Sequence, residues 1–498
     1  MNGALTFLIF LPALSAIPLL FEKNPKAVRW FTLFVTSCEL AISLLIYRLC
    51  RQGIFTGRAL LKTDYPWIAR FGIHYALMMD GISLLLVTLT ALLFALCTLV
   101  SWRQVSERVS LFHAMLLFLE TGIMGVFLSA DLFLFYLFWE VMLIPMFFLI
   151  GVFGHGRRVY SAVKFFVFTI TGSLFMLLSI IGVYIIHGRE TGVYSFMLRD
   201  LANTPASPML SGILFLGFLM GFAVKVPLFP LHTWLPDAHT DAPTAGSVIL
   251  AGLLLKTGAY GLIRVAFPLF PQAAAAFLPL IFTISVIGIF YAAWIAFAQK
   301  DMKRLIAYSS VSHLAYVILG IAVWNDVSLA GSVLQMVNHG ITTGALFIMI
   351  GMMDERMHTR DISAYGGLWN RAPVMSAFFL FFILSSLGLP GLNNFAGEFL
   401  ILTGVFRAHP WLCAAGFAGM VTTLIYLLSL AQKILFGPAK EYHGFNDLSG
   451  RELAVLIPLA ALVVFIGIYP SAVLKLLDAP IRNMVNTATI SSVGGVLP

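Results

Sequence analysis

The sequence predicts an all-α polytopic membrane protein with about fourteen transmembrane helices. Of its 498 residues, 60% are hydrophobic and only 10% are charged, whereas about 25% of the residues in a typical soluble domain are charged. Apolar stretches recur along the whole chain, and each is long enough to cross a hydrocarbon core of about 30 Å as a helix of about 20 residues. A spanning β-barrel would require segments of about ten residues with alternating polarity, which this chain lacks.

The predicted spans follow one another with short polar connections. They lie near 3–21, 29–50, 79–101, 110–129, 131–152, 160–187, 209–227, 242–266, 274–298, 303–323, 328–353, 372–409, 411–437 and 452–474. We divide the chain into three N-terminal spans with an extracytoplasmic loop at 51–78 (1–109), a first repeat of helices 4–8 (110–266), a second repeat of helices 9–13 (267–437), and a last span with its tail (438–498).

Lysine and arginine gather in alternate loops, which predicts the orientation of the chain. No basic residue precedes the first span, unlike a secretory signal peptide, and Lys23 follows it. The positive-inside rule then places both termini in the periplasm and the loop at 228–241 in the cytoplasm. The main exception is the loop 51–78, which is long enough to cross as a small folded excursion and contains Arg51, Arg58, Lys62 and Arg70.

The stretch from Gly221 to Gly261 contains the first sign of function. It places Lys225 and Lys256 inside two strongly apolar segments. A lysine near the middle of a span costs about 2.5–3.5 kcal/mol on insertion scales, so two of them in adjacent spans indicate ion movement. The connection between them is polar and rich in proline, and it contains His232, Asp237, His239 and Asp241.

Two predicted spans contain a break in the helix. Pro227 and Pro230 interrupt the seventh span just after Lys225, and the Gly388–Gly391 stretch interrupts the twelfth just before Glu398. Freed backbone carbonyl groups at membrane depth must face protein or water, so paired breaks indicate a pathway. The breaks lie five spans apart, and because five is odd, the second copy of a repeat would be inverted relative to the first.

Further ionisable residues lie inside predicted spans. Glu140 is in the middle of an apolar run, and His313 and His339 fall in the tenth and eleventh spans. A lone buried histidine is more often a core residue, and a lysine near a span end can extend to the interface. Together, however, the groups would cost on the order of 15–20 kcal/mol if they were unpaired and dry. We therefore predict a proton relay in the membrane plane, formed by Glu140, Lys225, Lys256, His313, His339 and Glu398.

Other polar residues have simpler interpretations. We expect Asp301, Lys303 and Arg304 to cap and anchor the tenth span and Trp234 to lie in an interfacial aromatic belt. His232 and His239 suit either a proton entrance or a solvated loop, and the pattern does not decide between the two.

The sequence gives no support for a cofactor bound by this chain. The four cysteines are far apart and lack CxxC spacing, so neither an iron–sulfur cluster nor a zinc site is indicated. Walker A and GxGxxG signatures are also absent. The net charge of +8 is scattered over short loops, which fits membrane topology rather than nucleic-acid binding. The cysteines are Cys38, Cys50, Cys97 and Cys413.

Four motifs resemble those of the antiporter-like subunits of respiratory complex I, the proton-translocating NADH:quinone oxidoreductase. They are KVPLFPLHTWLPDAHTDAPTAGSVILAGLLLKTGAYG, QKDMKRLIAYSSVSHL, VNHGITTGALF and LPGLNNFAGEF, and the similarity covers nearly the whole chain. The chain is most similar to the M-type member, the counterpart of mitochondrial subunit 4, because Glu398 stands where the L- and N-type paralogues have a lysine. It also ends after the fourteenth predicted span, without the long lateral helix of the L type.

The resemblance implies a role for each relay residue. Glu140 and Lys225 would form a switching pair, Lys256 with His313 and His339 a central connection, and Glu398 the terminal group of the half-channel. The chain would be a subunit of a proton-translocating translocase in the inner (plasma) membrane, next to the L and N paralogues. FMN, iron–sulfur clusters and quinone would be bound by other subunits.

Two alternatives remain open at this stage. The same helices could form an Mrp-type cation/proton antiporter or a subunit of a membrane-bound hydrogenase. A passive scaffold in a membrane arm fits less well, because six buried ionisable groups are costly in a protein without an ion pathway.

Overall fold

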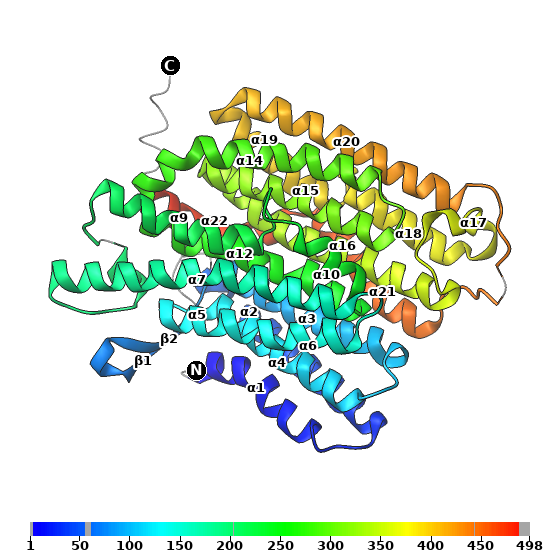
Figure 1. Cartoon of the computed structure of the whole chain (residues 1–498), viewed down its shortest axis with the longest axis horizontal. Helices are drawn as coiled ribbons and strands as arrows, with labels where there is room; N and C mark the ends of the chain where they lie inside the picture. Colours follow the sequence, from blue (N-terminus) through cyan, green and yellow to red (C-terminus); the bar gives the residue numbers. More distant parts are fainter. Residues whose placement is uncertain (1–2, 55–60, 203, 443, 488–498) are drawn as a thin grey trace.

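The computed structural model describes residues 3–54, 61–202, 204–442 and 444–487. These residues form a bundle of long helices that run side by side, with a small β-hairpin at one end (Figure 1). Among the described residues, twelve helical segments are long and apolar enough to cross a membrane, and two shorter apolar helices, α1 and α18, contribute further spans. The predicted all-α fold with about fourteen spans is therefore confirmed.

The N-terminal part contains three spans and the hairpin. The spans are α1 (Ala4–Leu19), α2 (Pro25–Ile54) and α3 (Gly81–Gln104). Strands β1 (Leu61–Ile68) and β2 (Ile73–Met79) pair antiparallel around the short helix η1 (Ala69–Phe71). Within the predicted loop at 51–78, residues 51–54 extend α2 and residues 61–79 form this hairpin. Arg58 lies outside the described residues, as do the side chains of Cys50 and Arg51.

The next five spans include three that consist of more than one helical segment. The five are α4 (Val109–Leu128); α5 (Leu132–Val141) with α6 (Leu143–Phe153); α7 (Arg158–Thr191); α9 (Pro208–Lys225) with α10 (Trp234–Asp241); and α11 (Thr244–Ile249), η2 (Leu250–Leu254), α12 (Leu255–Gly261), η3 (Leu262–Ala266) and α13 (Phe267–Leu269). The short helix α8 (Leu198–Leu201) precedes α9. In the eighth span, η2 and η3 are π-helical, a local widening that is frequent at functional sites.

The following five spans repeat this order, with a break again in the fourth. They are α14 (Pro271–Phe297), α15 (Met302–Val323), α16 (Asp326–Met357), α18 (Pro373–Ser386) with α19 (Asn393–Ala408), and α20 (Pro410–Leu435). Two short helices, η4 (Ile362–Ala364) and α17 (Leu368–Arg371), connect α16 to α18. The inverted relation between the two sets of five remains a prediction.

The C-terminal part differs from the prediction. The last span, α21 (Gly450–Ile468), is shorter than the predicted 452–474, and a separate helix, α22 (Ser471–Thr487), follows it. Leu477 and Ile481 of α22 are buried, while Lys475 and Arg482 are exposed. The hydrophobic run alone did not reveal this helix, because its apolar residues are confined to one face.

The centre of the bundle is formed by α16. Every residue in its most apolar 18-residue window is buried, against 28% of the corresponding window of α20. Helix α16 lies in the middle of Figure 1, and it packs against α11, α15, α19 and η2. The polar side chains along its buried length therefore face protein rather than lipid.

Both predicted helix breaks are present, and protein groups satisfy the freed backbone. After α9 ends at Lys225, the indole Nε1 of Trp234 donates to the Val224 carbonyl at 3.0 Å. Trp234 is fully buried, so our placement of it in an interfacial belt was wrong. Residues 234–241 are likewise not a loop but the helix α10, which completes the seventh span.

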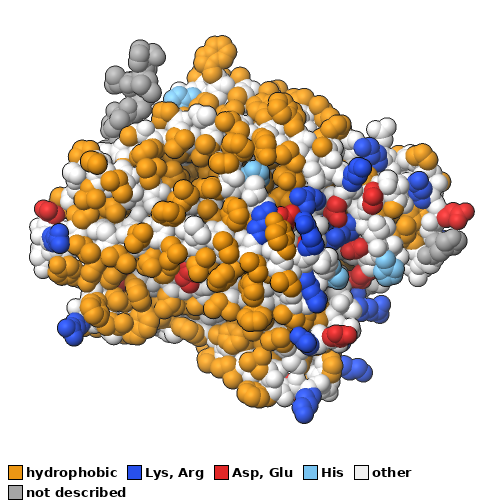
Figure 2. Space-filling view, in the orientation of Figure 1, with side chains coloured by type: hydrophobic (Ala, Val, Ile, Leu, Met, Phe, Trp, Pro, Cys, Tyr) orange, Lys and Arg blue, Asp and Glu red, His pale blue; other side chains and the backbone are white. Residues whose placement is uncertain are grey.

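Charged side chains concentrate at one end of the molecule. Figure 2 shows lysine, arginine and acidic residues gathered toward the right of the bundle, beside a broad apolar belt. The predicted cytoplasmic loops meet there: Arg360 Nη1 donates to the Thr240 carbonyl at 2.6 Å, and Arg304 pairs with Asp237 at 3.1 Å. The hairpin lies at the opposite end (Figure 1).

Candidate functional site

Four of the six predicted relay residues form a row of polar side chains in the core. Lys256 Nζ lies 2.6 Å from His339 Nδ1, and the rings of His339 and His313 are 6.0 Å apart between centroids. His313 Nδ1 then lies 2.8 Å from Glu398 Oε1. The four side chains come from α12, α16, α15 and α19 and are all buried. Groups far apart in the sequence thus form one row that crosses from helix to helix.

Local structure holds the two ends of this row in place. Lys256 follows the π-helical turn η2, and its Nζ also donates to the carbonyl of Ala251 within that turn. Glu398 Oε1 accepts a second hydrogen bond, from Gln335 Nε2 at 3.0 Å. Gly397 beside it has no side chain that would collide with Gln335, so α19 can approach α16 closely enough for this contact.

Polar residues at the second break were missed by sequence reasoning. Asn393 Oδ1 accepts from Ser385 Oγ at 2.7 Å, and Asn338 Nδ2 donates to the Asn393 carbonyl at 2.7 Å. These contacts join α16, α18 and the start of α19 where the backbone is irregular. The signal was present in the sequence, because Gln335 and Asn338 interrupt an apolar span four and one residues before His339.

The other two predicted residues, Glu140 and Lys225, are neighbours without a direct contact. Lys225 Nζ has no hydrogen-bond partner among the described residues, and neither has Glu140 Oε1. The charge of Glu140 nevertheless acts on Lys225. The ammonium group lies over the ring of Trp139, 5.1 Å from its centroid, within the range of a cation–π interaction. The predicted switching pair is therefore separated in this structure.

Three further buried ionisable residues were absent from our prediction. Glu39 on α2 and Glu120 on α4 are fully buried, and their carboxyl groups are neighbours. Their carboxyl oxygens lack hydrogen-bond partners among the described residues, and so do both ring nitrogens of His113. The signal that identified Glu140, a titratable residue inside an apolar run, applies equally to all three.

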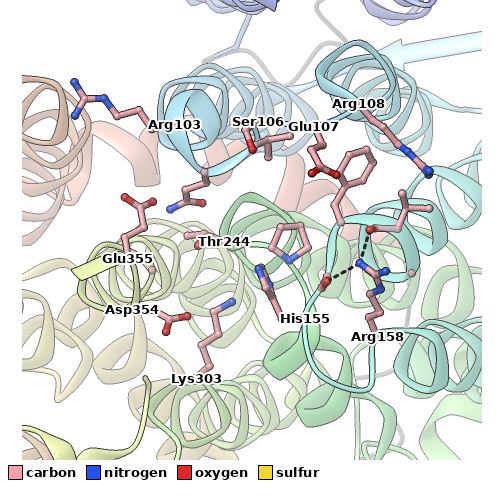
Figure 3. Close-up of a pocket in the computed structure, with 18 of the residues that line it drawn as sticks. Arg103, Ser106, Glu107, Arg108, His155, Arg158, Thr244, Lys303, Asp354 and Glu355 are labelled. Atoms are coloured by element: carbon pink, nitrogen blue, oxygen red, sulfur yellow. Dashed lines mark hydrogen bonds between the residues drawn. The ribbon is translucent and has the colours of Figure 1, made fainter. Parts of the chain in front are cut away.

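A large cavity opens at the charged end of the bundle, near α15 and α16. It has a volume of about 960 Å³, and Figure 3 shows Lys303 extending into it beside Asp354, with His155 nearby. Asp301 caps α15 as expected, by accepting from the Arg304 amide. Lys303 is not the surface anchor that we expected, because only 2% of it is exposed. Partial desolvation, followed by the positive charge of Lys303, lowers the pKa of His155 at the cavity.

The two histidines of the seventh span are also buried. His232 is 2% exposed and His239 is 0% exposed, which excludes the solvated-loop interpretation for both. No cluster of three or more His, Cys, Asp or Glu residues within the described ranges is arranged to hold a metal ion. The groups that the core does bring together are amines, imidazoles and carboxyls, which exchange protons rather than electrons.

The sequence matches known membrane subunits along its length. Residues 129–425 match the family model described as NADH:quinone oxidoreductase/Mrp antiporter, TM. The chain is 46% identical over 475 residues to NADH-quinone oxidoreductase subunit M of Pseudomonas aeruginosa, with 93% of each chain covered. It is 44% identical over 477 residues to the subunit M of Escherichia coli K12, with 92% of each covered.

Two solved structures of membrane complexes contain a chain with the same fold. A chain of respiratory complex I from Thermus thermophilus superimposes with a TM-score of 0.89 at 30% identity, covering 97% of this chain and 99% of that one. A chain of the Mrp complex from Dietzia sp. superimposes with a TM-score of 0.86 at 19% identity, covering 99% of both. Because the identity is only 19%, the second match shows that the two chains share a fold and no more.

Proposed function

This chain belongs to the family of membrane subunits that NADH:quinone oxidoreductase shares with the Mrp antiporters, and from that premise we propose how it moves protons. It is a proton-translocating membrane subunit of the oxidoreductase, of the M type. The observation that supports the mechanism is the row Lys256–His339–His313–Glu398, in which two contacts are already at hydrogen-bond distance.

The row can pass a proton by successive transfers between nitrogen and oxygen atoms. The Lys256 ammonium group donates to His339 Nδ1, and His313 Nδ1 exchanges with Glu398 Oε1. Between the two rings, the Nε2 atoms of His339 and His313 have no partner among the described residues. A ring rotation or a bridging water completes that step, since neutral imidazole has one donor and one acceptor nitrogen.

The pair Glu140 and Lys225 acts as the switch for this row. When an ion pair forms, it stabilises the charged form of both groups. When it breaks, the two groups can change their protonation states more easily. The separated arrangement, with Lys225 over Trp139, fits the open state of such a pair. Lys225 is the last residue of α9 and Glu140 precedes the interruption at Met142, so small movements at two helix ends would change their separation.

Several further assignments belong to this proposal. FMN, iron–sulfur clusters and the quinone are held by other subunits, and the L- and N-type paralogues are the membrane neighbours. Both termini face the periplasm, and helices 4–8 and 9–13 form the inverted repeats. The alternatives, an Mrp-type antiporter or a hydrogenase subunit, receive less support, since the identity to subunit M is 46% and to the Mrp chain 19%.

The test is proton pumping in membranes that contain the assembled complex. We expect Lys256→Met and Glu140→Gln to reduce NADH:quinone turnover and pumping about tenfold or more, because the first removes a group from the transfer path and the second removes the acidic member of the switching pair. NADH oxidation with a water-soluble acceptor should stay unchanged, which controls for assembly. Normal coupled pumping by the assembled Lys256→Met variant would refute the relay.

A further inference from the structure

The eighth span contains a second cation, Arg264, between Lys256 and the hairpin end of the bundle. Lys256, Tyr260 and Arg264 follow one another at intervals of four residues, and side chains at that spacing lie on one face of a helix. At a rise of about 1.5 Å per residue, Arg264 lies about 12 Å beyond Lys256 along the span. The side chain of Arg264 is only 12% exposed, so its charge lies inside the protein.

Asp80, which directly follows the hairpin, holds the guanidinium group of Arg264. Arg264 Nη2 donates to Asp80 Oδ2, and Asp80 Oδ1 accepts from the amides of Ile82 and Ser83 at 3.0 Å and 3.1 Å. Those amides begin α3, so the carboxylate also compensates the positive end of a helix. Arg264 Nε has no hydrogen-bond partner among the described residues. The guanidinium group is therefore a buried charge that Asp80 does not fully satisfy.

Tyr260 lies one helical turn from each of the two cations and begins a short run of hydroxyl groups. Its Oη donates to the Phe127 carbonyl at 2.8 Å and lies 3.0 Å from Ser83 Oγ. The guanidinium carbon of Arg264 lies 5.7 Å from the centre of the Tyr260 ring. A hydroxyl group can accept a proton and pass one on, whereas a carbonyl group only accepts a hydrogen bond and a guanidinium group only donates. The run therefore ends at Phe127 and Arg264.

We propose that Arg264, held by Asp80, is an electrostatic seal that prevents protons on Lys256 from leaking along the eighth span to the hairpin end. The inference rests on the proposed function, because such a leak requires that Lys256 carries a proton. A proton that left Lys256 in this direction would have to pass a fixed positive charge, and arginine neither accepts that proton nor releases its own in proteins. Positive charges exclude protons from membrane pores in the same way. The open direction for the proton is then sideways, to His339 Nδ1 at 2.6 Å.

A purely structural role for the Arg264–Asp80 pair makes a different prediction. In that case the pair only ties the end of the eighth span to the start of α3, and its removal lowers stability without changing proton permeability. The Arg356–Glu452 pair provides a matched comparison. Its side chains are 14% and 6% exposed, against 12% for both members of the first pair. It joins the last turn of α16 to the first turn of α21 at the charged end, by contacts of 2.8 Å and 2.9 Å.

The experiment uses proteoliposomes that contain the assembled complex with Arg264→Met, and it follows the decay of an imposed pH gradient without NADH. We expect the gradient to decay about tenfold faster than in the parent, because one charge sets the barrier. NADH:quinone turnover should stay near the parental rate while the number of protons pumped per turnover falls. Two variants should hold the gradient like the parent: the matched control Arg356→Met, and Asp80→Asn, which keeps the cation.

A double variant connects the leak to the relay. Arg264→Met combined with Lys256→Met lacks the proton carrier next to the seal, so its gradient should decay as slowly as that of the parent. If Arg264→Met does not assemble, Arg264→Gln makes the same test, because its amide removes the charge and still donates to Asp80.

Four outcomes would overturn the seal, and all are distinguishable from failure of the relay. An assembled Arg264→Met complex that holds the gradient would show that the cation blocks nothing. An equal leak from Arg356→Met or Asp80→Asn would show that loss of an ion pair, not of the positive charge, opens the path. A double variant that leaks as fast as Arg264→Met would show that the path does not begin at Lys256. The relay has its own test, since normal pumping by Lys256→Met refutes it whatever the gradients show.

Discussion

Glu398 is the residue at which the chemistry of the row changes from nitrogen bases to a carboxyl group. It accepts from Gln335 and lies within hydrogen-bond distance of His313. A capping role does not explain it, since it lies five residues after α19 begins at Asn393 and N-terminal capping acts within the first turn. The geometry therefore favours a group that takes up and releases a proton.

Substitution of Glu398 tests this role. We expect Glu398→Asp to retain much of the pumping and Glu398→Lys to retain some, because both side chains titrate. Glu398→Gln should lose most of it, although the amide can still accept from Gln335. The measurement is proton pumping with NADH:quinone turnover in assembled membranes. A Gln variant that pumps as well as the parent would leave Glu398 with a structural role only.

For the pair Glu39 and Glu120, in contrast to Glu398, we expect that substitution leaves pumping intact. Two adjacent carboxylates in an apolar interior cannot both be ionised without large cost. Glu39→Gln supplies amide donors to Glu120 and replaces one of the two carboxyl groups that must otherwise be kept neutral, so we expect the midpoint of thermal unfolding to rise, by an amount equivalent to about 1 kcal/mol. Pumping should be unchanged. A Glu39→Gln complex that assembles but fails to pump would place the pair on the proton path.

At this scale, the sequence shows which ionisable residues lie inside apolar spans, but it does not show their contacts. An ionisable residue inside an apolar run is visible without a structure, so Lys256, His339 and Glu398 could be found. The burial of Lys303 and His239 could not be predicted, because they lie near span ends, where the same pattern also fits snorkelling or solvated side chains. Only the packing of α10 against α15 shows that both are buried.

At the scale of elements, the relay residues lie next to irregularities in their helices. Glu140 precedes the interruption at Met142, Lys225 ends α9, and Lys256 follows η2. Proline and glycine revealed the breaks in the seventh and twelfth spans. The interruption at Met142 in the fifth span has a marker of the same kind, Pro145, which removes the helical hydrogen bond to the Val141 carbonyl and which we did not use. The π-helical turns in the eighth span contain no proline.

Gly388 and Gly391 offer a matched test of the second break. Both have positive φ, at 76° and 91°, so alanine at either position costs about 1–2 kcal/mol in backbone strain. Only at Gly388 would the added Cβ meet Glu398, 3.3 Å from Oε2, while nothing lies within 4 Å at Gly391. We expect similar losses of thermal stability from both variants but reduced pumping from Gly388→Ala alone. Equal pumping by the two variants would show that a side chain at position 388, next to Glu398, does not affect proton transfer.

At the scale of the whole molecule, the alternation of charged loops predicts the orientation in the membrane. Arg103 lines the cavity at the charged end, and Tyr65 is exposed on the hairpin at the other. In a variant without native cysteines, we expect Arg103→Cys to react with an impermeant thiol reagent only from the cytoplasmic side. Tyr65→Cys should react only from the periplasmic side. Labelling of position 103 from outside would invert the proposed map.

The row from Lys256 to Glu398 steps between neighbouring helices instead of running along one of them. Because the helices are aligned with the membrane normal, a charge that moves along this row travels parallel to the bilayer surface. Work against a transmembrane voltage, about 2.3 kcal/mol per elementary charge for each 100 mV, arises only from displacement along the normal. Transfer within the row is therefore electrically silent, and the membrane potential opposes only the uptake and release of the proton at its two ends.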